Sequence, residues 1–201
     1  MKPEIFKAYD IRGIYPTEIN EDDAYHIGRA VVEHLQPKVL GVGRDIRESS
    51  PRLFESFAKG VMDGGANVID LGIITTSMVY FAAGRLDIDA AVSLTASHNP
   101  PEYNGLKIAL RGAVPVGETT GLREIRDLAL KQEWPTITER GTMTSEDVKH
   151  AYYGYFASFA DFKGKHFTIA IDTANSMGVD ELPIYEQFAD NLSVVNLYND
   201  L

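Results

Sequence analysis

Ser97, His98 and Lys107 stand in one short segment, residues 95–107, which reads TASHNPPEYNGLK. A serine hydroxyl is a weak nucleophile unless a base, a positive field or a metal ion activates it. His98 could supply the base, Lys107 could supply the positive field, and a serine or phosphoester oxygen suits a hard cation. The residue types therefore indicate nucleophilic chemistry at Ser97.

The elements on either side of this segment place it at the edge of a sheet. The apolar run at residues 90–94 predicts a buried strand, and residues 106–110 predict a second one. Prolines, asparagines and a glycine between them cannot continue either strand, so residues 97–104 are expected to form a loop. Ligands of open α/β sheets tend to bind at such strand ends. The alternative is an ordinary hairpin, in which Ser97 and Asn99 bond only their own backbone.

Two further segments extend the pattern: residues 8–13 read AYDIRG and residues 43–51 read GRDIRESSP. Together with residues 95–107 they resemble the motifs of the α-D-phosphohexomutases, in particular the phosphomannomutase/phosphoglucomutase branch, whose phosphoserine loop corresponds to residues 95–107. The resemblance runs over essentially all 201 residues. It implies an intramolecular phosphotransferase, an isomerase that interconverts hexose 1-phosphate and hexose 6-phosphate through a phosphoserine and a bisphosphorylated sugar.

The resemblance implies three catalytic residues. Ser97 would be the phosphoryl carrier and, once phosphorylated, a ligand of Mg²⁺. Lys107 would act as an acid/base or as a charge stabiliser. His98 would act on the sugar hydroxyl or, as an equal alternative, support the loop, because a neighbouring residue does not easily aim at Ser97 itself.

Substrate binding is implied for Tyr9, Arg12 and Asn99. Tyr9 and Arg12 would line the entrance and help to hold phosphate, for which a planar, permanently charged guanidinium is suited. The alternative for Arg12 is a structural surface pair with Asp10, and Asn99 could instead fix the shape of the loop. Arg44, at the C-terminal end of a predicted strand, is expected to support the loop rather than to grip the substrate.

The family takes its other Mg²⁺ ligands from a D-G-D-x-D-R loop, which residues 1–201 do not contain. The D-x-D at residues 87–89 lacks the glycine and the arginine, and we expect it to be exposed to solvent. The remaining Mg²⁺ ligands are thus expected beyond residue 201, with glucose or mannose 1,6-bisphosphate as the activator. On this interpretation the chain is the N-terminal part of a longer one and is inactive alone, and the choice between mannose and glucose stays open.

Strands and helices alternate along the chain, which predicts βαβ crossovers. The pattern favours an α/β fold with a mixed, largely parallel sheet and helices on both faces, followed by the start of a second similar α/β domain. We assign residues 1–142 to the first domain, 143–163 to an interdomain helix and 164–201 to an incomplete second domain. Within the last of these, residues 180–192 are expected to form a helix bent by Pro183.

Composition limits the partners. The formal net charge of −10 argues against nucleic acid and anionic membrane surfaces, so an anionic sugar phosphate would need locally placed cations. The absence of cysteine excludes disulfides and thiol catalysis. No apolar stretch approaches the roughly 20 residues of a membrane helix, and a cytoplasmic location is expected. Self-association through the incomplete second domain is also expected, because one βαβ unit buries too little of its own sheet.

Two other classes of function compete with the mutase interpretation. A serine hydrolase would need a G-x-S-x-G elbow, which the sequence lacks, and its histidine does not normally adjoin the serine. A non-catalytic phosphosugar-binding or regulatory module, derived from the N-terminal region of a mutase, could be phosphorylated at Ser97 without turnover.

Overall fold

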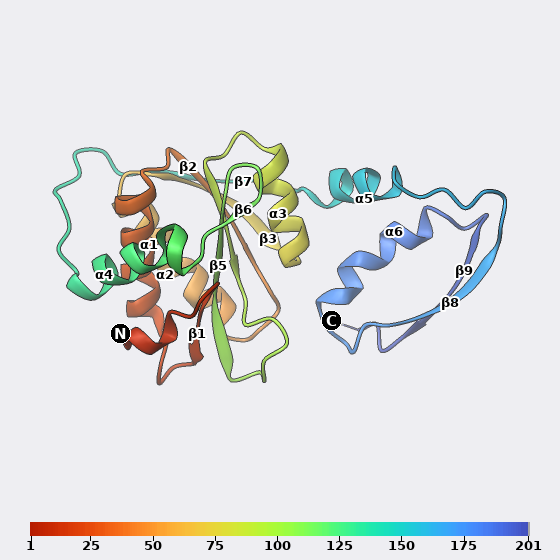
Figure 1. Ribbon diagram of the computed structural model, residues 1–201, viewed down its shortest axis with the longest axis horizontal. Coiled ribbons are helices and arrows are strands. Elements are labelled where there is room, and N and C mark those ends of the chain that lie inside the picture. Colours follow the sequence, from red (N-terminus) through yellow and green to blue (C-terminus); the bar gives the residue numbers. More distant parts are fainter. Residues whose placement is uncertain (201) are drawn as a thin grey trace. The chain divides into compact units, whose positions relative to one another are not determined.

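The computed structural model describes residues 1–200 and divides the chain into two compact units. Unit 1 is Met1–Glu146 and unit 2 is Asp147–Leu201. Figure 1 shows unit 1 as a sheet with helices on both sides, and unit 2 as a small strand pair with short helices. The division falls after residue 146 rather than after residue 142 because Met143–Ser145 forms strand β7, which pairs in parallel with β3 of unit 1.

The sheet of unit 1 has seven strands in the order β1-β5-β4-β2-β3-β7, with β6 paired to β5. Strands β4, β2, β3 and β7 are mutually parallel, whereas β5 runs antiparallel to both β4 and β1. This is the mixed, largely parallel sheet that the sequence predicts. The bounds are β1 Ile11–Ile14, β2 Val39–Arg44, β3 Asn67–Ile73, β4 Ala90–Leu94, β5 Tyr103–Leu110, β6 Val114–Pro115 and β7 Met143–Ser145.

Helices cover both faces of this sheet (Figure 1). Three of them pack their apolar side chains with alternate strand residues into one core on the first face, as Phe57, Val92 and Leu106 illustrate. On the opposite face, Val79 of α3 lies against Gly43 of β2. The helices of unit 1 are η1 Pro3–Ile5, α1 Glu21–Leu35, α2 Ser50–Asp63, α3 Thr76–Arg85, η2 Glu118–Leu122 and α4 Arg123–Lys131.

Local sequence explains where two of these helices begin. The side chain of Asn20 accepts a hydrogen bond from the amide of Asp23, and the Asp23 carboxylate accepts one from the amide of Asn20, which completes a capping box at α1. Thr75 caps α3 by accepting from the amide of Met78. Because α3 begins close to the end of β3, it folds back over the second face of the sheet and limits how far that face is open.

Unit 2 contains a two-stranded parallel sheet, β8 (Phe167–Asp172) and β9 (Leu192–Leu197). Its helices are α5 (Lys149–Ala157), η3 (Met177–Glu181) and α6 (Leu182–Glu186). The helix expected over residues 180–192 is therefore much shorter, because Leu192 already pairs with Phe167 in the strand ladder. Pro183 lies in the first turn of α6, where its missing amide is tolerated, and does not bend the helix.

The D-x-D segment at residues 87–89 has a structural function that the sequence did not predict. The Asp87 side chain is exposed, as expected, but Asp89 accepts hydrogen bonds from the amides of Lys38 at 2.8 Å and Val39 at 3.1 Å. Asp89 also pairs with Arg111 of the turn after β5. Hydrogen bonds from these two amides, with a smaller contribution from Arg111, lower the pKa of the Asp89 carboxyl. Asp89 thus ties the start of β2 to the connection before β4.

We expect Asp89 to make the stability of unit 1 depend on pH. Because the folded state lowers its pKa, the carboxylate stabilises the fold above its ordinary pKa of 3.8, and this contribution is lost as pH falls through the lowered value. Asp89→Asn removes the charge at every pH. Urea unfolding between about pH 7 and about pH 3 should therefore show wild type losing more stability than the variant. Parallel pH profiles of the two proteins would contradict this assignment.

No helix within the described residues is long and apolar enough to cross a membrane. The cytoplasmic location stays a prediction from the sequence.

Candidate functional site

The segment between β4 and β5 forms the loop that the sequence predicts, at the C-terminal end of β4. The amide of Thr95 donates to the carbonyl of Gly105, so the loop leaves the sheet directly after this bond. Ser97 follows with φ +56°, the left-handed region that costs a residue with a β-carbon about 1–2 kcal/mol. Its amide donates to the hydroxyl of Thr95 at 2.9 Å, which stabilises this conformation. Ser97 and His98 are both exposed to solvent.

His98 lies within reach of the serine, although the two residues are neighbours in sequence. The distance between Ser97 Oγ and His98 Nδ1 is 3.4 Å. This is a long hydrogen bond that a bound substrate could tighten. His98 thus lies within reach of the Ser97 hydroxyl, which the sequence analysis did not expect of a neighbouring residue.

Arg47, from the connection between β2 and α2, donates hydrogen bonds to the backbone carbonyl oxygens of the loop. Its guanidinium donates to the carbonyls of Ser97 (2.9 Å), Asn99 (2.7 Å), Pro100 (2.6 Å) and Tyr103 (2.9 Å). Its Nε donates to Asp45 Oδ2 at 3.1 Å, which fixes the side chain from behind. Arg47 belongs to the GRDIRESSP motif, but the sequence gave no reason to single it out.

Asn99 also serves the shape of the loop. Its side-chain amide donates to the carbonyl of Ala96 at 2.7 Å, and its backbone amide donates to the same oxygen. These bonds close a turn over residues 96–99, with Ser97 and His98 at its centre. Of the two roles considered for Asn99, loop support is the one these bonds favour, and substrate binding stays a prediction.

A buried polar network lies beneath the loop. Asp45 Oδ1 accepts from the hydroxyl of Ser50 at 2.6 Å and from the amide of Arg47 at 3.1 Å. The side-chain amide of Asn104, which is fully buried, donates to the hydroxyls of Ser49 and Ser50. Buried polar groups of this kind specify one arrangement when all are satisfied. We call residues 95–102, between β4 and β5, the serine loop. The network fixes the GRDIRESSP motif against the end of this loop.

Strand register brings the predicted cations to one face of the sheet. In antiparallel pairs, residues directly opposite each other point to the same face. Arg12 of β1 lies opposite Gly105 of β5, and Lys107, two residues further along β5, lies opposite Ser93 of β4. Arg12 and Lys107 thus share the face that α3 covers in part, beside the strand that leads into Ser97. The guanidinium of Arg12 makes no hydrogen bond or ion pair with any residue in the range 1–200, so its charge is available to an anion.

Lys107 has a partner that the sequence analysis assigned elsewhere. Its ammonium lies 3.2 Å from Asp10 Oδ2, and both side chains are largely buried. Tyr80 of α3 belongs to the same neighbourhood: its own burial, together with the charge of Asp10, raises the pKa of its phenol. Asp10 therefore pairs with Lys107, and the surface pair with Arg12 that we considered does not form.

Arg44 does not have the role that the sequence suggested. Its guanidinium donates to Asp70 Oδ1 at 2.7 Å and stacks over the ring of Phe54, 4.2 Å from the ring centroid. It links β2 to β3 and α2, whereas loop support comes from Arg47. Tyr9, by contrast, lies on the surface with 79% of its area exposed, which suits a residue at an entrance.

Metal ligands are scarce around Ser97. Among residues 1–200, no group of three or more histidine, aspartate or glutamate side chains could hold a metal ion. The carboxylate of Asp45 is engaged with Arg47, and that of Asp10 with Lys107. The described residues therefore do not build a Mg²⁺ site by themselves.

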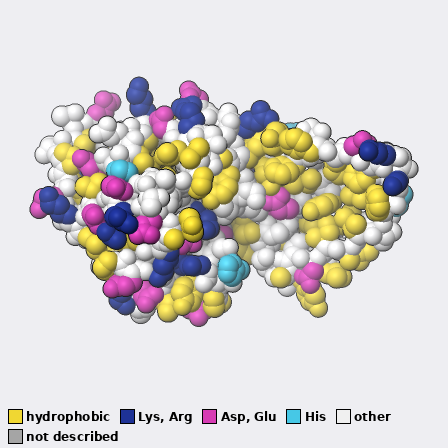
Figure 2. All heavy atoms as spheres, viewed as in Figure 1, with side chains coloured by type: hydrophobic (Ala, Val, Ile, Leu, Met, Phe, Trp, Pro, Cys, Tyr) yellow, Lys and Arg dark blue, Asp and Glu magenta, His cyan; other side chains and the backbone are white. Residues whose placement is uncertain are grey.

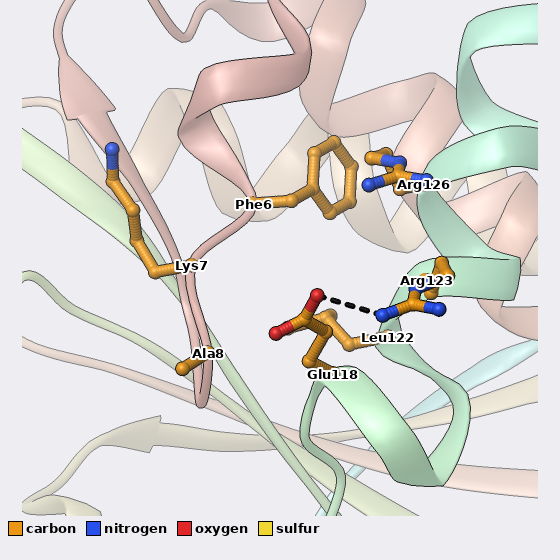
Figure 3. Close-up of a pocket in the computed structure, with 7 residues that line it drawn as sticks. All are labelled: Phe6, Lys7, Ala8, Glu118, Leu122, Arg123 and Arg126. Atoms are coloured by element: carbon orange, nitrogen blue, oxygen red, sulfur yellow. Dashed lines mark hydrogen bonds and ion pairs between the residues drawn. The ribbon is translucent and has the colours of Figure 1, made fainter.

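A separate pocket of about 120 Å³ lies between the N-terminal segment and α4. Figure 3 shows Phe6 and Leu122 on its walls, with Glu118 directed at Arg123. Two of the cations around it are paired, Arg123 with Glu118 at 2.9 Å and Arg126 with Asp127 at 2.7 Å, whereas the ammonium of Lys7 donates to the carbonyl oxygen of Glu4. None of the residues of the loop that carries Ser97 lines this pocket.

Comparison with known proteins agrees with this geometry. Residues 3–136 match the family described as phosphoglucomutase/phosphomannomutase, alpha/beta/alpha domain I. A phosphomannomutase of Klebsiella pneumoniae is 44% identical over 149 residues, covering 73% of this chain and 95% of that sequence. A crystal structure of a phosphoglucomutase/phosphomannomutase family protein from Burkholderia thailandensis, 28% identical, superposes with a TM-score of 0.85 and covers 100% of this chain and 45% of that one.

Unit 1 is an α/β domain with an exposed serine on a loop at the end of a strand, and Arg47 holds this loop. The match over residues 3–136 identifies this unit as domain I of a mutase. The chain belongs to the phosphoglucomutase/phosphomannomutase family. It spans only part of several relatives: the phosphomannomutase of Escherichia coli strain K12 is 41% identical over 160 residues, which cover 79% of this chain and 35% of that sequence.

Proposed function

We propose that this chain carries the phosphoryl-transfer loop of a phosphohexomutase that interconverts hexose 1-phosphate and hexose 6-phosphate, with Ser97 as the carrier. The observation that supports this most is the geometry of Ser97 itself. Its hydroxyl is exposed, stands in a strained left-handed backbone conformation and lies 3.4 Å from His98. Strain of this kind persists where the surrounding structure enforces it and is concentrated at functional sites.

The proposed step moves one phosphoryl group between two oxygens. From phosphorylated Ser97, the P–O bond to Oγ breaks and a bond to a hydroxyl oxygen of the sugar phosphate forms. The proton of that hydroxyl ends on the serine oxygen, directly or by way of His98. The same step in reverse, at the other end of a reoriented bisphosphate, returns the phosphoryl group to Ser97. Hexose 1,6-bisphosphate, of glucose or of mannose, would therefore serve as the activator.

The cations of the sheet would bind and stabilise charge during this step. Lys107, held by Asp10, would stabilise charge on the transferring group or act as its acid/base, and Arg12 would bind the phosphate that does not react. Catalysis of phosphoryl transfer depends mainly on such positioning and electrostatics. Tyr9 would line the entrance, where a sugar ring could pack against its exposed face.

For Mg²⁺, the only ligand that we propose within this chain is phosphorylated Ser97. A phosphoserine oxygen is a suitable ligand for this cation, and when bound the ion would neutralise part of the phosphoryl charge. Since the described residues supply no further ligand group, we propose that residues 1–201 alone do not complete a catalytic cycle.

Phosphate uptake tests the proposal. The chain is incubated with glucose 1,6-bisphosphate or mannose 1,6-bisphosphate, and its intact mass is measured. We expect the addition of one phosphate, which fragmentation assigns to Ser97. If the chain binds hexose phosphate in a thermal-shift assay but takes up no phosphate, the alternative of a non-catalytic phosphosugar-binding or regulatory module is favoured instead. Labelling by an organophosphonate would indicate a serine hydrolase and contradict both.

We also propose that unit 2 mediates self-association. Both strands of its parallel sheet expose apolar side chains, and parallel sheets are normally covered on both faces. Figure 2 shows hydrophobic side chains gathered on the surface of this unit. The largest exposed ones are Phe159 (68%), Tyr198 (66%), Val195 (49%), Phe167 (46%), Leu197 (42%) and Phe156 (41%).

The expected result is a mass that rises with concentration in light scattering after size exclusion. Phe159→Ser should shift this transition to higher concentration, because it removes an exposed ring without disturbing a strand. Leu130→Ser, at a partly exposed position on α4 of unit 1, is the matched control. A constant monomer mass, or an equal effect of both variants, would count against self-association through unit 2.

A further inference from the structure

The carbonyl oxygens of the serine loop affect how well the loop can hold a phosphate on Ser97. A phosphoserine carries close to two negative charges and three acceptor oxygens. A tight turn made of residues 97–103 has carbonyl oxygens on its surface, and each carries partial negative charge. If these oxygens faced the phosphate, they would repel it, so a loop that holds a phosphoserine must direct them elsewhere.

In this structure four of those oxygens are directed at one guanidinium. The guanidinium of Arg47 donates hydrogen bonds to the carbonyl oxygens of Ser97, Asn99, Pro100 and Tyr103 at 2.6–2.9 Å. Arginine suits this arrangement because its donors form a rigid planar fork with a permanent charge. Lysine has a single nitrogen with three donors and cannot reproduce the fork.

The guanidinium is itself fixed. Asp45 binds its Nε at 3.1 Å, and the same carboxylate is held by the hydroxyl of Ser50 and by the amide of Arg47. The Arg47 side chain is only 12% exposed. Bonds between a charged donor and neutral acceptors are among the stronger hydrogen bonds in proteins, and partial burial strengthens them.

We propose that Arg47 is a positioning residue for the phosphorylated form of Ser97. By binding the carbonyl oxygens on the inner side of the loop, it leaves the hydroxyl of Ser97 and the ring of His98 on the outer side, free of repelling acceptors. It acts through the loop backbone and does not touch the transferring group. This inference rests on the proposed function for its purpose, but the conformational part of it can be tested without any phosphoryl transfer.

Arg47→Lys and Arg47→Ala are compared with wild type by hydrogen exchange of the loop amides. The amides of Ser97, Asn99 and Tyr103 are hydrogen-bonded within the turn and report directly on its closure. We expect their exchange to accelerate about 10-fold or more in both variants, since several charge-assisted bonds are lost together. The rest of unit 1 should keep its protection. Arg111→Lys, which changes an exposed ion-paired arginine at the far end of β5, is the matched control.

A second measurement follows the rate of phosphate uptake from hexose 1,6-bisphosphate. A loop displaced by even 1 Å can lose about 100-fold in rate. We expect the maximal rate to fall by about that factor in Arg47→Lys, while the bisphosphate concentration that gives half-maximal rate stays unchanged. Methylguanidinium should restore part of the rate in Arg47→Ala, because it replaces the missing fork, whereas methylammonium should not.

The outcomes separate the two proposals. If wild type takes up no phosphate but the loop amides of both Arg47 variants lose protection selectively, the proposed function fails and the loop assignment of Arg47 stands. Unchanged loop exchange overturns the inference whatever the labelling shows, and so does a uniform loss of protection throughout unit 1. A rise in the half-maximal concentration with no change in maximal rate would make Arg47 a binding residue and would likewise overturn it.

Discussion

Replacement of Ser97 by alanine is expected to abolish phosphate uptake from hexose 1,6-bisphosphate completely. The variant lacks the oxygen to which the phosphoryl group would be transferred, and three nearby serine and threonine hydroxyls are buried. Thr95 is buried and its oxygen already accepts from the amide of residue 97. Ser49 and Ser50 are buried in the network with Asn104. Intact-mass measurement should therefore show the unmodified chain at every time point.

The fold of this variant should remain intact, which makes the loss interpretable. The hydroxyl of Ser97 is exposed and has only the long contact with His98, so its removal costs little stability. Alanine occupies the left-handed region about as poorly as serine does. Ser77→Ala, an exposed serine in α3, is the control and should be labelled like wild type. Labelling of Ser97→Ala at the wild-type rate would show that the carrier is another residue.

The sequence predicts the loop well because its determinants are local. An apolar run, a cluster of prolines and asparagines, and a second apolar run follow one another within residues 90–110, and each acts on its own backbone. The caps at Asn20 and Thr75 are equally local, since each side chain accepts a hydrogen bond from the amide three residues further on. Strand identity and the position of Ser97 at a strand end therefore follow from residues close together in the chain.

The supporting contacts depend on residues distant in sequence, and here the sequence misleads. Arg44 and Arg47 stand three residues apart in one motif. The neighbouring residues do not indicate which of the two arginines contacts the loop, which lies some 50 residues further along the chain. The structure decides it by geometry: Arg44 is the last residue of β2 and its side chain reaches Asp70 on the neighbouring strand, whereas Arg47 lies past the strand, where the chain turns toward the loop. The pairing of Asp10 with Lys107 is equally non-local.

Alanine at Gly105 is expected to destabilise unit 1 strongly. Gly105 lies opposite Arg12 in the β1–β5 ladder, and a β-carbon there would overlap the carbonyl oxygen of Ile11. That oxygen belongs to the backbone of β1, so the clash cannot be relieved by turning a side chain. Either β1 separates from β5 or the ladder is distorted, and overpacking of this kind costs about 3 kcal/mol. For a unit of this size, thermal unfolding should shift downward by roughly 10 °C.

The same substitution should impair the site beyond its effect on stability, because β1 carries Arg12 and directly follows Asp10. Displacing β1 moves Arg12 directly and moves Asp10, one residue before the strand, away from Lys107. Phosphate uptake measured well below the melting temperature should therefore be slower in Gly105→Ala than in wild type. Gly84→Ala is the matched control: it lies in helix α3 with open space around it, and alanine should stabilise it by about 0.5–1 kcal/mol. Equal melting temperatures for Gly105→Ala and wild type would show that β1 yields without cost, and the close β1–β5 contact would then not be what holds Arg12 and Asp10 beside the serine loop.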